Sequence, residues 1–215
     1  MLFAALGVWQ LERRVWKLDL VATVEARLAA PPVDLLDRSR WNAFGQPGAA
    51  YTRVRLSGWF LHDRETAVQA VTELGPGYWI LTPLVTRAGV VLVNRGFVPP
   101  DKRDPHSRTA GLVDRAQVTG LVRTSEPGGA FLRSNDPGQN RWYSRDVAAI
   151  AHARGLGAVA PFFVDADAAP VPGGWPRGGL TVVAFRNTHL VYALTWFGLA
   201  ILSVGGLVLV LRTDA

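Results

Sequence analysis

One imidazole stands directly before a long apolar run of the chain. His189 precedes Leu190–Leu211, a stretch without a charged side chain. Tyr192 and Trp196 follow at i+3 and i+7, so the three side chains share one face if the segment is a helix. Two kinds of chemistry fit this pattern. His, Tyr and Trp form a belt where a helix enters a membrane, and a neutral imidazole also binds the iron of a haem.

A further residue bears on the haem interpretation. Arg186 lies about one helical turn before His189, where a guanidinium can pair with a haem propionate. Tyr192 and Trp196 would then hold the macrocycle. Spacing alone favours the interfacial interpretation, and the sequence leaves both open.

The apolar run has the length of a membrane span. A hydrocarbon core of roughly 30 Å needs about 20 apolar residues in a helix, and Leu190–Leu211 supplies them. Arg186 and Arg212 flank the run, as charged residues do at the ends of a span. We therefore predict a C-terminal transmembrane helix over residues 189–212.

A second membrane segment is expected at the N-terminus. "MLFAALGVWQL" is apolar or neutral, but as a helix it reaches only about 16 Å, half of a bilayer. It lacks the positive n-region and the cleavage site of a signal peptide. We expect the end of a first transmembrane helix whose start lies upstream, and a short interfacial helix is the alternative.

Helical spacing continues over residues 7–28, and a pair of prolines ends it. Trp9, Arg13 and Trp16 fall at i, i+4 and i+7 on one face. Two helices that enter one bilayer from one domain have little room to separate. We therefore expect the two helices side by side, with Trp9 or Arg13 facing His189.

Between the two helices the sequence alternates in the manner of β-strands. Two of these strands flank "RAG" and indicate a hairpin, and Gly58 is a candidate bulge. The polar loop "PPDKRDPHSR", residues 99–108, should be mobile and solvent-exposed. The predicted strands are residues 51–60, 65–71, 78–86, 89–98, 116–124, 161–166 and 180–185.

These elements predict an α+β membrane protein. A mainly antiparallel β domain with a barrel-like or curled sheet should cover residues 31–188. It would lie between an N-terminal membrane segment and helix, residues 1–30, and the C-terminal transmembrane helix. Within the domain, residues 33–50 should form a loop, and a short helix should follow Ser144 as its N-cap and end before Gly155.

The remaining titratable residues form no catalytic pattern. The sequence has no nucleophile elbow, no phosphate-cradling glycine loop and no metalloprotease histidine pair, so we expect no enzyme activity. His62 and His106 should lie at the surface, and Asp165 and Asp167 in a solvated turn. Arg95, at a strand end, fits either a carboxylate or propionate partner or a structural ion pair.

Composition narrows the class of protein. A chain of 215 residues suffices for one domain and its membrane anchors. The absence of cysteine excludes disulfides, thiolate metal sites and a cysteine nucleophile. The net charge is +6, but the Lys and Arg residues are scattered, which favours membrane-flanking positions over nucleic-acid binding.

Several segments together resemble one known family. "NTHLVYALTWFGLA" resembles the closing signature of the Surfeit-locus family of cytochrome c oxidase assembly proteins, and "GVWQLERRVWK" resembles its opening signature. The blocks "RVRLSGWF", "GYWILTPL", "VVLVNRGFVP" and "RWYSRDVAAIA" follow in the family's order. The resemblance runs from Gly7 to about Val210. It departs at Thr188, where the family usually has Asn, and in the short first helix.

The resemblance implies a role in maturing haem-copper oxidase, by binding haem A and assisting its insertion into subunit I. A membrane-anchored scaffold that docks subunit I or other assembly factors without haem is the alternative. By position, the family's transmembrane histidine is His189. The residues expected to hold haem A are His189 for the iron and, around it, Tyr192, Trp196, Arg186, Arg13 and Trp9.

The resemblance also implies a place and partners. It implies a multi-pass protein of the bacterial inner membrane with its domain on the periplasmic side. Its partners would be membrane lipid, oxidase subunit I and haem A synthesis or assembly proteins, but not nucleic acid. The charges do not fix this topology, because Arg13, Arg14 and Lys17 would lie on the domain side and the domain far exceeds roughly 60 residues, beyond which the positive-inside rule loses force.

Overall fold

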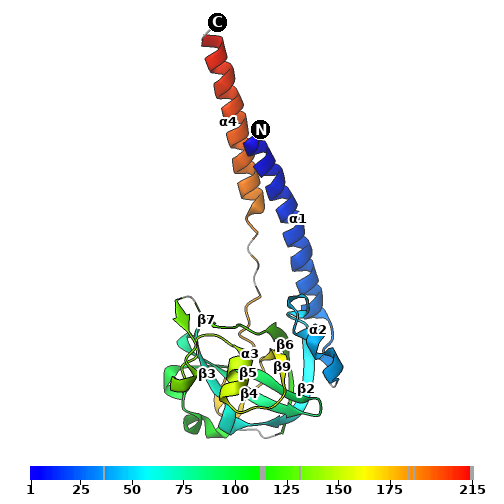
Figure 1. The fold of residues 1–215 in the computed structure, drawn as a ribbon, viewed down its shortest axis with the longest axis vertical. Coiled ribbons are helices and arrows are strands. Elements are labelled where there is room, and N and C mark those ends of the chain that lie inside the picture. Colours follow the sequence, from blue (N-terminus) through cyan, green and yellow to red (C-terminus); the bar gives the residue numbers. More distant parts are fainter. Residues whose placement is uncertain (36, 112–114, 131, 184, 186, 214–215) are drawn as a thin grey trace. The chain divides into compact units, whose positions relative to one another are not determined.

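The computed structural model describes the chain apart from residues 36, 112–114, 131, 184, 186 and 214–215 (Figure 1). Contacts divide the chain into two units. One unit joins residues 1–26 to residues 183–215, and the other comprises residues 27–182. The two ends of the chain therefore belong to one unit, which carries the long helices, and the middle of the chain forms the other.

The unit of residues 27–182 is built mainly from strands. The larger strands are β2 (Arg53–Phe60), β3 (Thr66–Thr72), β4 (Gly75–Thr86), β5 (Gly89–Val98), β6 (Arg115–Thr124) and β9 (Val159–Ala166). Two-residue strands are β1 (Val33–Asp34), which pairs with β2, and β7 (Gly129–Ala130) and β8 (Arg133–Ser134), which pair with each other. Six of the seven predicted strands are thereby confirmed.

Five of these strands close into a barrel. The sheet order is β1-β2-β6-β9-β5-β4-β3, and an additional pairing of β2 with β4 completes the ring β2-β6-β9-β5-β4 (Figure 1). Within the ring, β5 and β9 run parallel and the other neighbours run antiparallel. The predicted barrel-like, mainly antiparallel sheet is confirmed.

Gly58 lies where the ring closes. It is paired with Thr86 of β4 on one side and with Ala116 of β6 on the other. A Cβ atom added to Gly58 would come within 2.2 Å of the backbone oxygen of Val85. The prediction of a bulge at Gly58 was therefore wrong, because this glycine serves a close approach of two strands within a regular register.

Two short helices pack against the barrel. In α2 (Trp41–Phe44), the two terminal aromatic rings pack on Phe162 of β9, with ring centroids 6.3 and 6.1 Å away. The segment 33–50, predicted as a loop, thus contains a helical turn whose aromatic rings fill the core. The second helix, α3 (Val147–Ala153), buries Val147 and Ile150 in an apolar cluster with Trp142.

The N-cap of α3 differs from the prediction. The carboxylate of Asp146 accepts a hydrogen bond from the backbone N–H of Ala149 at 3.1 Å, so Asp146 is the cap. Ser144 instead donates its hydroxyl to the backbone oxygen of Glu126 at 2.7 Å. Gly155 lies beyond the helix end with φ of 59°, as predicted.

The segment 180–185, the last predicted strand, does not join the sheet. Its described residues, 180–183 and 185, have no regular secondary structure. The hydrogen-bonding edges of β9, the strand before it in the chain, are already taken by β5 and β6. The alternating sequence of this segment is therefore not sufficient for it to form a strand, because the ring of five strands is complete without the segment.

The loop 99–108 is mostly exposed and contains two short 3₁₀ turns. Arg108 is the exception, because its side chain is only 1% exposed and pairs with Glu65 at 2.5 Å. Its Nε also donates to the backbone oxygen of Lys102 at 2.6 Å. The predicted exposure of this loop is confirmed except at its end, where one arginine anchors it to the domain.

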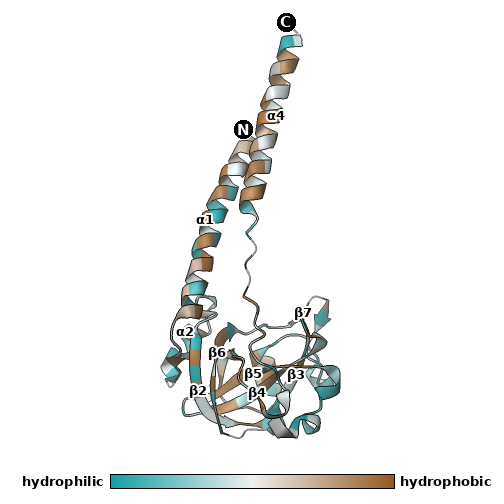
Figure 2. Cartoon of the chain, turned by 180° about the vertical axis from the view of Figure 1, so that it is seen from behind, coloured by the Kyte–Doolittle hydropathy of each residue, from teal (hydrophilic) through white to brown (hydrophobic). Residues whose placement is uncertain are grey.

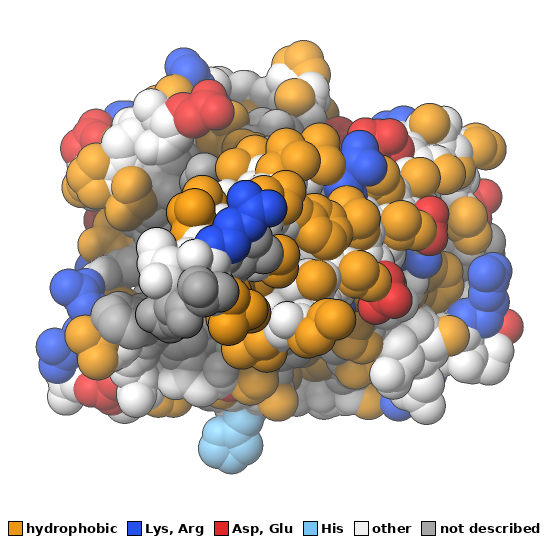
Figure 3. Space-filling model, turned by 90° about the horizontal axis from the view of Figure 1, so that it is seen from above, with side chains coloured by type: hydrophobic (Ala, Val, Ile, Leu, Met, Phe, Trp, Pro, Cys, Tyr) orange, Lys and Arg blue, Asp and Glu red, His pale blue; other side chains and the backbone are white. Residues whose placement is uncertain are grey.

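The helical unit contains α4 (His189–Thr213), which begins at the histidine itself. With 25 residues it is about 37 Å long. In the described part of the chain it is the one helix whose length and composition suit a membrane crossing, with a mean hydropathy of 2.3. In Figure 2 most of α4 is brown or white, with teal at its two ends, and Figure 3 shows hydrophobic side chains gathered in the middle of the face that it draws. This agrees with the predicted C-terminal transmembrane helix.

The other long helix, α1 (Leu2–Ala29), alternates hydrophobic and hydrophilic residues along its length (Figure 2). The predicted helix is confirmed, and it ends two residues before Pro31. The described part of α1 does not have the composition of a membrane span. The prediction of a first span in this segment is therefore not supported beyond its helical form.

Within the helical unit, α1 and α4 pack side by side. Phe3 stacks on Trp196 with ring centroids 5.8 Å apart, and a Cβ atom on Gly7 would come within 2.5 Å of the ring of Phe197. Gln10 reaches His189. The start of α1 meets the middle of α4 through Phe3 and Trp196, whereas Gln10, further along α1, meets the first residue of α4, so the helices run antiparallel. The predicted neighbourhood of the two segments is confirmed.

Candidate functional site

The side chain of His189 is held between the two long helices. Its Nδ1 lies 2.7 Å from the amide oxygen of Gln10, and the imidazole is half-buried. An amide oxygen only accepts hydrogen bonds, so in the neutral imidazole Nδ1 is the donor to Gln10 and Nε2 carries the lone pair. No described residue forms a hydrogen bond with Nε2. A histidine that binds a metal through Nε2 commonly has this arrangement, with the other nitrogen fixed by a hydrogen bond.

The structure separates the aromatic residues that were predicted to share a face with His189. Ala193 is 1% exposed and Trp196 stacks on Phe3, so both face α1 together with His189. Tyr192 is 54% exposed and lies beside this face. Positions i, i+4 and i+7 therefore form the contact face of α4, and position i+3 flanks it.

Gln10, rather than Trp9 or Arg13, faces His189. Trp9 is 50% exposed, and Arg13 stacks its guanidinium over the Trp16 ring at 4.3 Å. The prediction that one of them faces His189 was wrong, because a helix turns about 100° per residue and the inner stripe begins one position further along. That stripe runs through Phe3, Gly7 and Gln10. The glycine was the available signal, since it permits close approach of two helices.

Cationic side chains lie on the same stripe of α1 or next to it. Arg14 and Lys17 are partly buried, and the ammonium of Lys17 lies 5.1 Å from the Phe185 ring centroid. Phe185 belongs to the segment that leads into α4. Arg186, the predicted propionate partner, falls outside the described residues.

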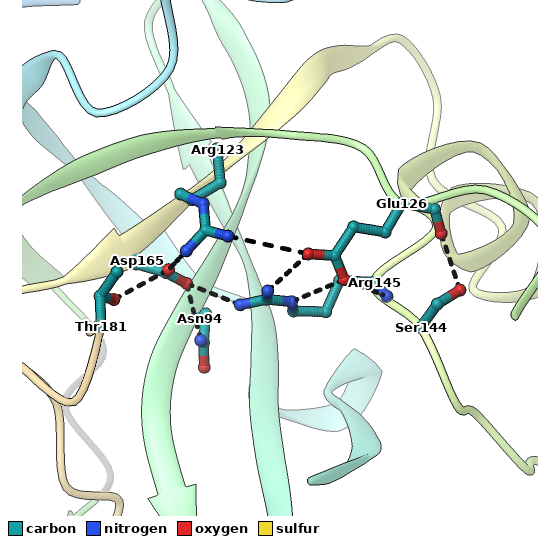
Figure 4. Close-up of polar contacts among 7 residues, drawn as sticks. All are labelled: Asn94, Arg123, Glu126, Ser144, Arg145, Asp165 and Thr181. Carbon is teal, nitrogen blue, oxygen red and sulfur yellow. Dashed lines mark hydrogen bonds and ion pairs between the residues drawn. The ribbon is translucent and has the colours of Figure 1, made fainter. Parts of the chain in front are cut away.

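A second polar cluster lies in the barrel unit, around Asp165 of β9 (Figure 4). Its Oδ1 accepts hydrogen bonds from Asn94 at 2.7 Å and Arg145 at 3.3 Å. Its Oδ2 accepts from Arg123 at 2.8 Å and Thr181 at 2.9 Å. Asp165 is 3% exposed, so the prediction of a solvated turn was wrong for this residue. Four partners from separate segments satisfy the buried carboxylate.

Asp167, two residues further along the chain, agrees better with the predicted solvated turn. Its side chain is 38% exposed and pairs with Arg53 of β2 at 2.7 Å. Asp165 lies within β9, whereas Asp167 follows Ala166, the last residue of that strand. One carboxylate is therefore buried in the barrel wall, and the other forms a surface ion pair.

Arg145 joins Asp165 to Glu126. Its guanidinium forms a two-point contact with the Glu126 carboxylate, through Nη2 at 2.5 Å and Nε at 3.0 Å. Burial alone would raise the pKa of Glu126, but hydrogen bonds and charge from Arg145, with the charge of Arg123, outweigh it and lower the pKa. Burial opposes the charged form of Arg145, yet Glu126 and Asp165 raise its pKa.

The charges of this cluster balance. Two guanidinium groups, of Arg123 and Arg145, meet two carboxylates, of Glu126 and Asp165. A pocket of about 380 Å³ opens beside the cluster, lined also by Thr72, Glu73, Trp79 and Leu180 among others. Because each charge already has an opposite partner, the cluster offers no free charge to a ligand.

Arg95, for which the sequence left open a carboxylate or propionate partner or a structural ion pair, belongs to the barrel unit. Its Nη1 lies 3.3 Å from His62 Nδ1, and its guanidinium lies 5.1 Å from the Phe60 ring centroid. Burial lowers the pKa of Arg95. His62 is half-buried and therefore less exposed than predicted, whereas His106 is exposed as predicted.

The described residues contain no group of three or more His, Cys, Asp or Glu side chains that could hold a metal ion. The candidate ligand site is therefore His189, which lies between the two helices. Together the features define a class of protein, which has a five-stranded β-barrel domain and a unit of two antiparallel helices, one of which has the length and composition of a membrane span.

Comparison with known proteins gives the family. The model of the SURF1 family matches residues 1–201. The human Surfeit locus protein 1 is 37% identical over 91% of this chain and 69% of its own length. The chicken protein of the same name, from Gallus gallus, is 38% identical over 90% of the chain and 67% of its own length. The SURF1-like protein of Monosiga brevicollis is 37% identical over 93% and 79%. The chain belongs to the SURF1 family, which confirms the resemblance.

Proposed function

We propose that this chain is an assembly factor for haem-copper cytochrome c oxidase, which binds haem A at His189 and assists its insertion into subunit I. Membership of the SURF1 family and the sequence signatures support the assembly role. The observation that carries the haem site is the hydrogen bond of Gln10 to His189, because it fixes the tautomer whose Nε2 can bind iron.

The residues around His189 fit a haem in chemistry and restrict where it can lie. Arg13, Arg14 and Lys17 supply positive charge for the propionates within the helical unit. The contact of Gly7 with Phe197 leaves no room for a macrocycle between the helices at that level. The macrocycle would therefore lie against the flank of the helix pair, at the end where α4 begins.

Each residue then has a defined task. Gln10 holds the imidazole in place through Nδ1, and His189 presents Nε2. The cations of α1 neutralise carboxylates, and Trp196, with Tyr192 and Trp9, provides aromatic surface. When bound, haem A would supply an iron, and His189 would hold it through Nε2. Arg186 is proposed for a propionate from its sequence position alone.

The alternative function is a membrane-anchored scaffold that docks subunit I or other assembly factors without haem. One observation favours it. The Gln10–His189 hydrogen bond joins the two helices directly. In this case His189 would serve helix packing, and the haem would reach subunit I by another route.

The proposal includes the setting of the protein. We place α4 in the inner membrane of a bacterium, with α1 as a second membrane segment and the barrel on the periplasmic side. Subunit I, proteins of haem A synthesis or assembly, and membrane lipid are the proposed partners, without nucleic acid. We propose no catalytic activity, since the chain has none of the enzyme motifs considered above.

The two functions differ in one simple measurement. The full chain is produced in cells that synthesise haem A, purified in its membrane environment, and its visible absorption spectrum is recorded. The carrier function predicts haem A that remains with the protein in a fixed ratio through purification. The scaffold function predicts a protein without haem absorption that still binds subunit I.

A further inference from the structure

The helix α1 has three distinct faces. One packs on α4 through Gly7 and Gln10. Another carries Trp9, Arg13 and Trp16, and the guanidinium of Arg13 stacks on the Trp16 ring. At about 100° per residue, a third face lies roughly a third of a turn from each of them. This heptad face consists of Ala4, Val8, Leu11, Val15, Leu18 and Ala22.

The heptad face is apolar and exposed. Val8 is 51% exposed, Leu11 38%, Val15 58% and Leu18 44%. The spacing along it alternates strictly between four and three residues, which is a seven-residue repeat. A strict repeat of seven is the pattern of a left-handed coiled coil, because it keeps one seam of each helix facing its partner. The contacts of α1 with α4 use different residues, so this seam is available.

We infer that the heptad face of α1 pairs with the same face of a second copy of this chain, as a parallel two-stranded coiled coil. The residue types support two strands. Val8 and Val15 occupy the a positions, and Leu11 and Leu18 occupy the d positions. β-branched residues at a with leucine at d favour parallel dimers over higher oligomers.

Charges beside the seam support the same pairing. Arg14 stands at position g, and Asp19 stands at the e position of the following heptad. In a parallel pair, Arg14 of one copy meets Asp19 of the second copy, with opposite charge. In an antiparallel pair, Glu12 would meet Asp19 of the second copy, and like charges would oppose pairing. The charge pattern therefore selects the parallel orientation.

The membrane imposes the same orientation. If α4 spans the bilayer, every copy of the chain enters the membrane in one direction, so two α1 helices in one membrane are parallel from the start. Confinement to the membrane also raises the effective concentration of the second copy. Three heptads of modest apolar residues, too few for a stable dimer in dilute solution, then suffice in this setting.

The absence of cysteine permits a clean test. Val15→Cys places one thiol at an a position of the heptad face. Trp16→Cys places one thiol a single residue further along α1, on the face that carries Trp9. Each full-length variant is oxidised in membranes, and disulfide-linked dimer is measured on gels. A disulfide needs Cα atoms within about 7 Å, so self-crosslinking at Val15 requires that the heptad faces of two copies meet at this position. We expect Val15→Cys to crosslink at least several-fold more than Trp16→Cys.

A charge exchange gives the second arm. Asp19→Arg should lower the crosslinked fraction at Val15 several-fold, and adding Arg14→Asp should restore it, because the pair is then reversed. The mass of the purified wild-type chain in detergent, by light scattering, gives a reading without any substitution. Equal crosslinking at Val15 and Trp16, crosslinking of Val15 to a different protein, or a monomeric mass together with no crosslink at Val15 would overturn the inference.

Discussion

At the scale of single residues, Gln10 and His189 define the candidate site from positions 179 residues apart in the chain. The imidazole could be singled out from the sequence because it stands alone before an apolar run. Its partner could not be found in this way. Trp9 and Arg13 are more conspicuous residues, and only the rotation of α1 against α4 decides that the neighbouring glutamine faces inward.

The first prediction concerns Gln10. Replacing it by leucine removes the acceptor of the His189 Nδ1 proton while keeping similar size. Loss of such an outer hydrogen bond typically lowers metal-site affinity about 10–100-fold, and we expect a loss in this range for haem A, measured by titration of the purified apoprotein. Gln117→Leu, at an exposed site in the barrel, should bind like wild type. Unchanged affinity in Gln10→Leu would show that this hydrogen bond has no part in haem binding.

The second prediction grades the aromatic residues of α4. Trp196→Ala removes the ring that stacks on Phe3, so it should lower haem content more than Tyr192→Phe, which keeps its ring and changes an exposed hydroxyl. Haem content per protein is measured by absorption of pyridine extracts. The reverse order would mean that the Tyr192 hydroxyl contributes more to haem retention than the Trp196 ring.

A third residue-scale prediction concerns Glu126 and pH. Its pKa is lowered in the folded chain, so its ionised form stabilises the fold above the ordinary value near 4.5, and this contribution is lost as pH falls through the lower folded value. Glu126→Gln should therefore be less stable than wild type at pH 7, by about 1 kcal/mol, since its side chain is 37% exposed and partly screened by solvent. Urea unfolding of both proteins at pH 7 and near pH 3.5 checks this. A difference that persists at low pH would mean that the carboxylate charge is not its cause.

At the scale of elements, closure of the barrel depends on strand pairings that the sequence does not reveal. Alternating or continuous apolar residues identified the strands of the ring, since β2 and β6 bury every second residue whereas β5 is buried at consecutive positions. It also suggested a strand at 180–185, which the closed ring leaves without a partner. Closure depends on the pairing of β2 with β4 around Gly58, and a glycine in a strand has the same sequence signature whether it forms a bulge or permits close approach.

The prediction at this scale is that Gly58→Ala destabilises the barrel. The new methyl group would meet the backbone oxygen of Val85 at 2.2 Å, and backbone cannot move aside as a side chain can. We expect a loss of about 1–3 kcal/mol in the free energy of unfolding, measured with denaturant. Gly48→Ala is the matched control, because nothing lies within 4 Å of its added Cβ. A Gly58→Ala protein as stable as the control would mean that the β2–β4 contact is not closely packed.

At the scale of the whole molecule, the sequence predicted the order of the elements better than their chemistry. The apolar run, the proline-terminated helix and the hairpins are local patterns, and the structure retains them. The Asp165 cluster is not local, because its partners come from β5, β6, the segment before α3, and residue 181. A carboxylate near a strand end therefore looked solvated in the sequence, although three-dimensional closure buries it.

Binding of haem A to His189 is the central claim, and the haem A content of His189→Ala tests it most directly. The variant, the wild type and His152→Ala are purified from the same cells that synthesise haem A. His152 is an exposed residue of α3 in the barrel unit and serves as the histidine control. We predict that His189→Ala folds, enters the membrane and carries no haem A, whereas His152→Ala carries as much as wild type. Haem A at the wild-type level in His189→Ala, with an unchanged absorption spectrum, would contradict axial ligation by His189.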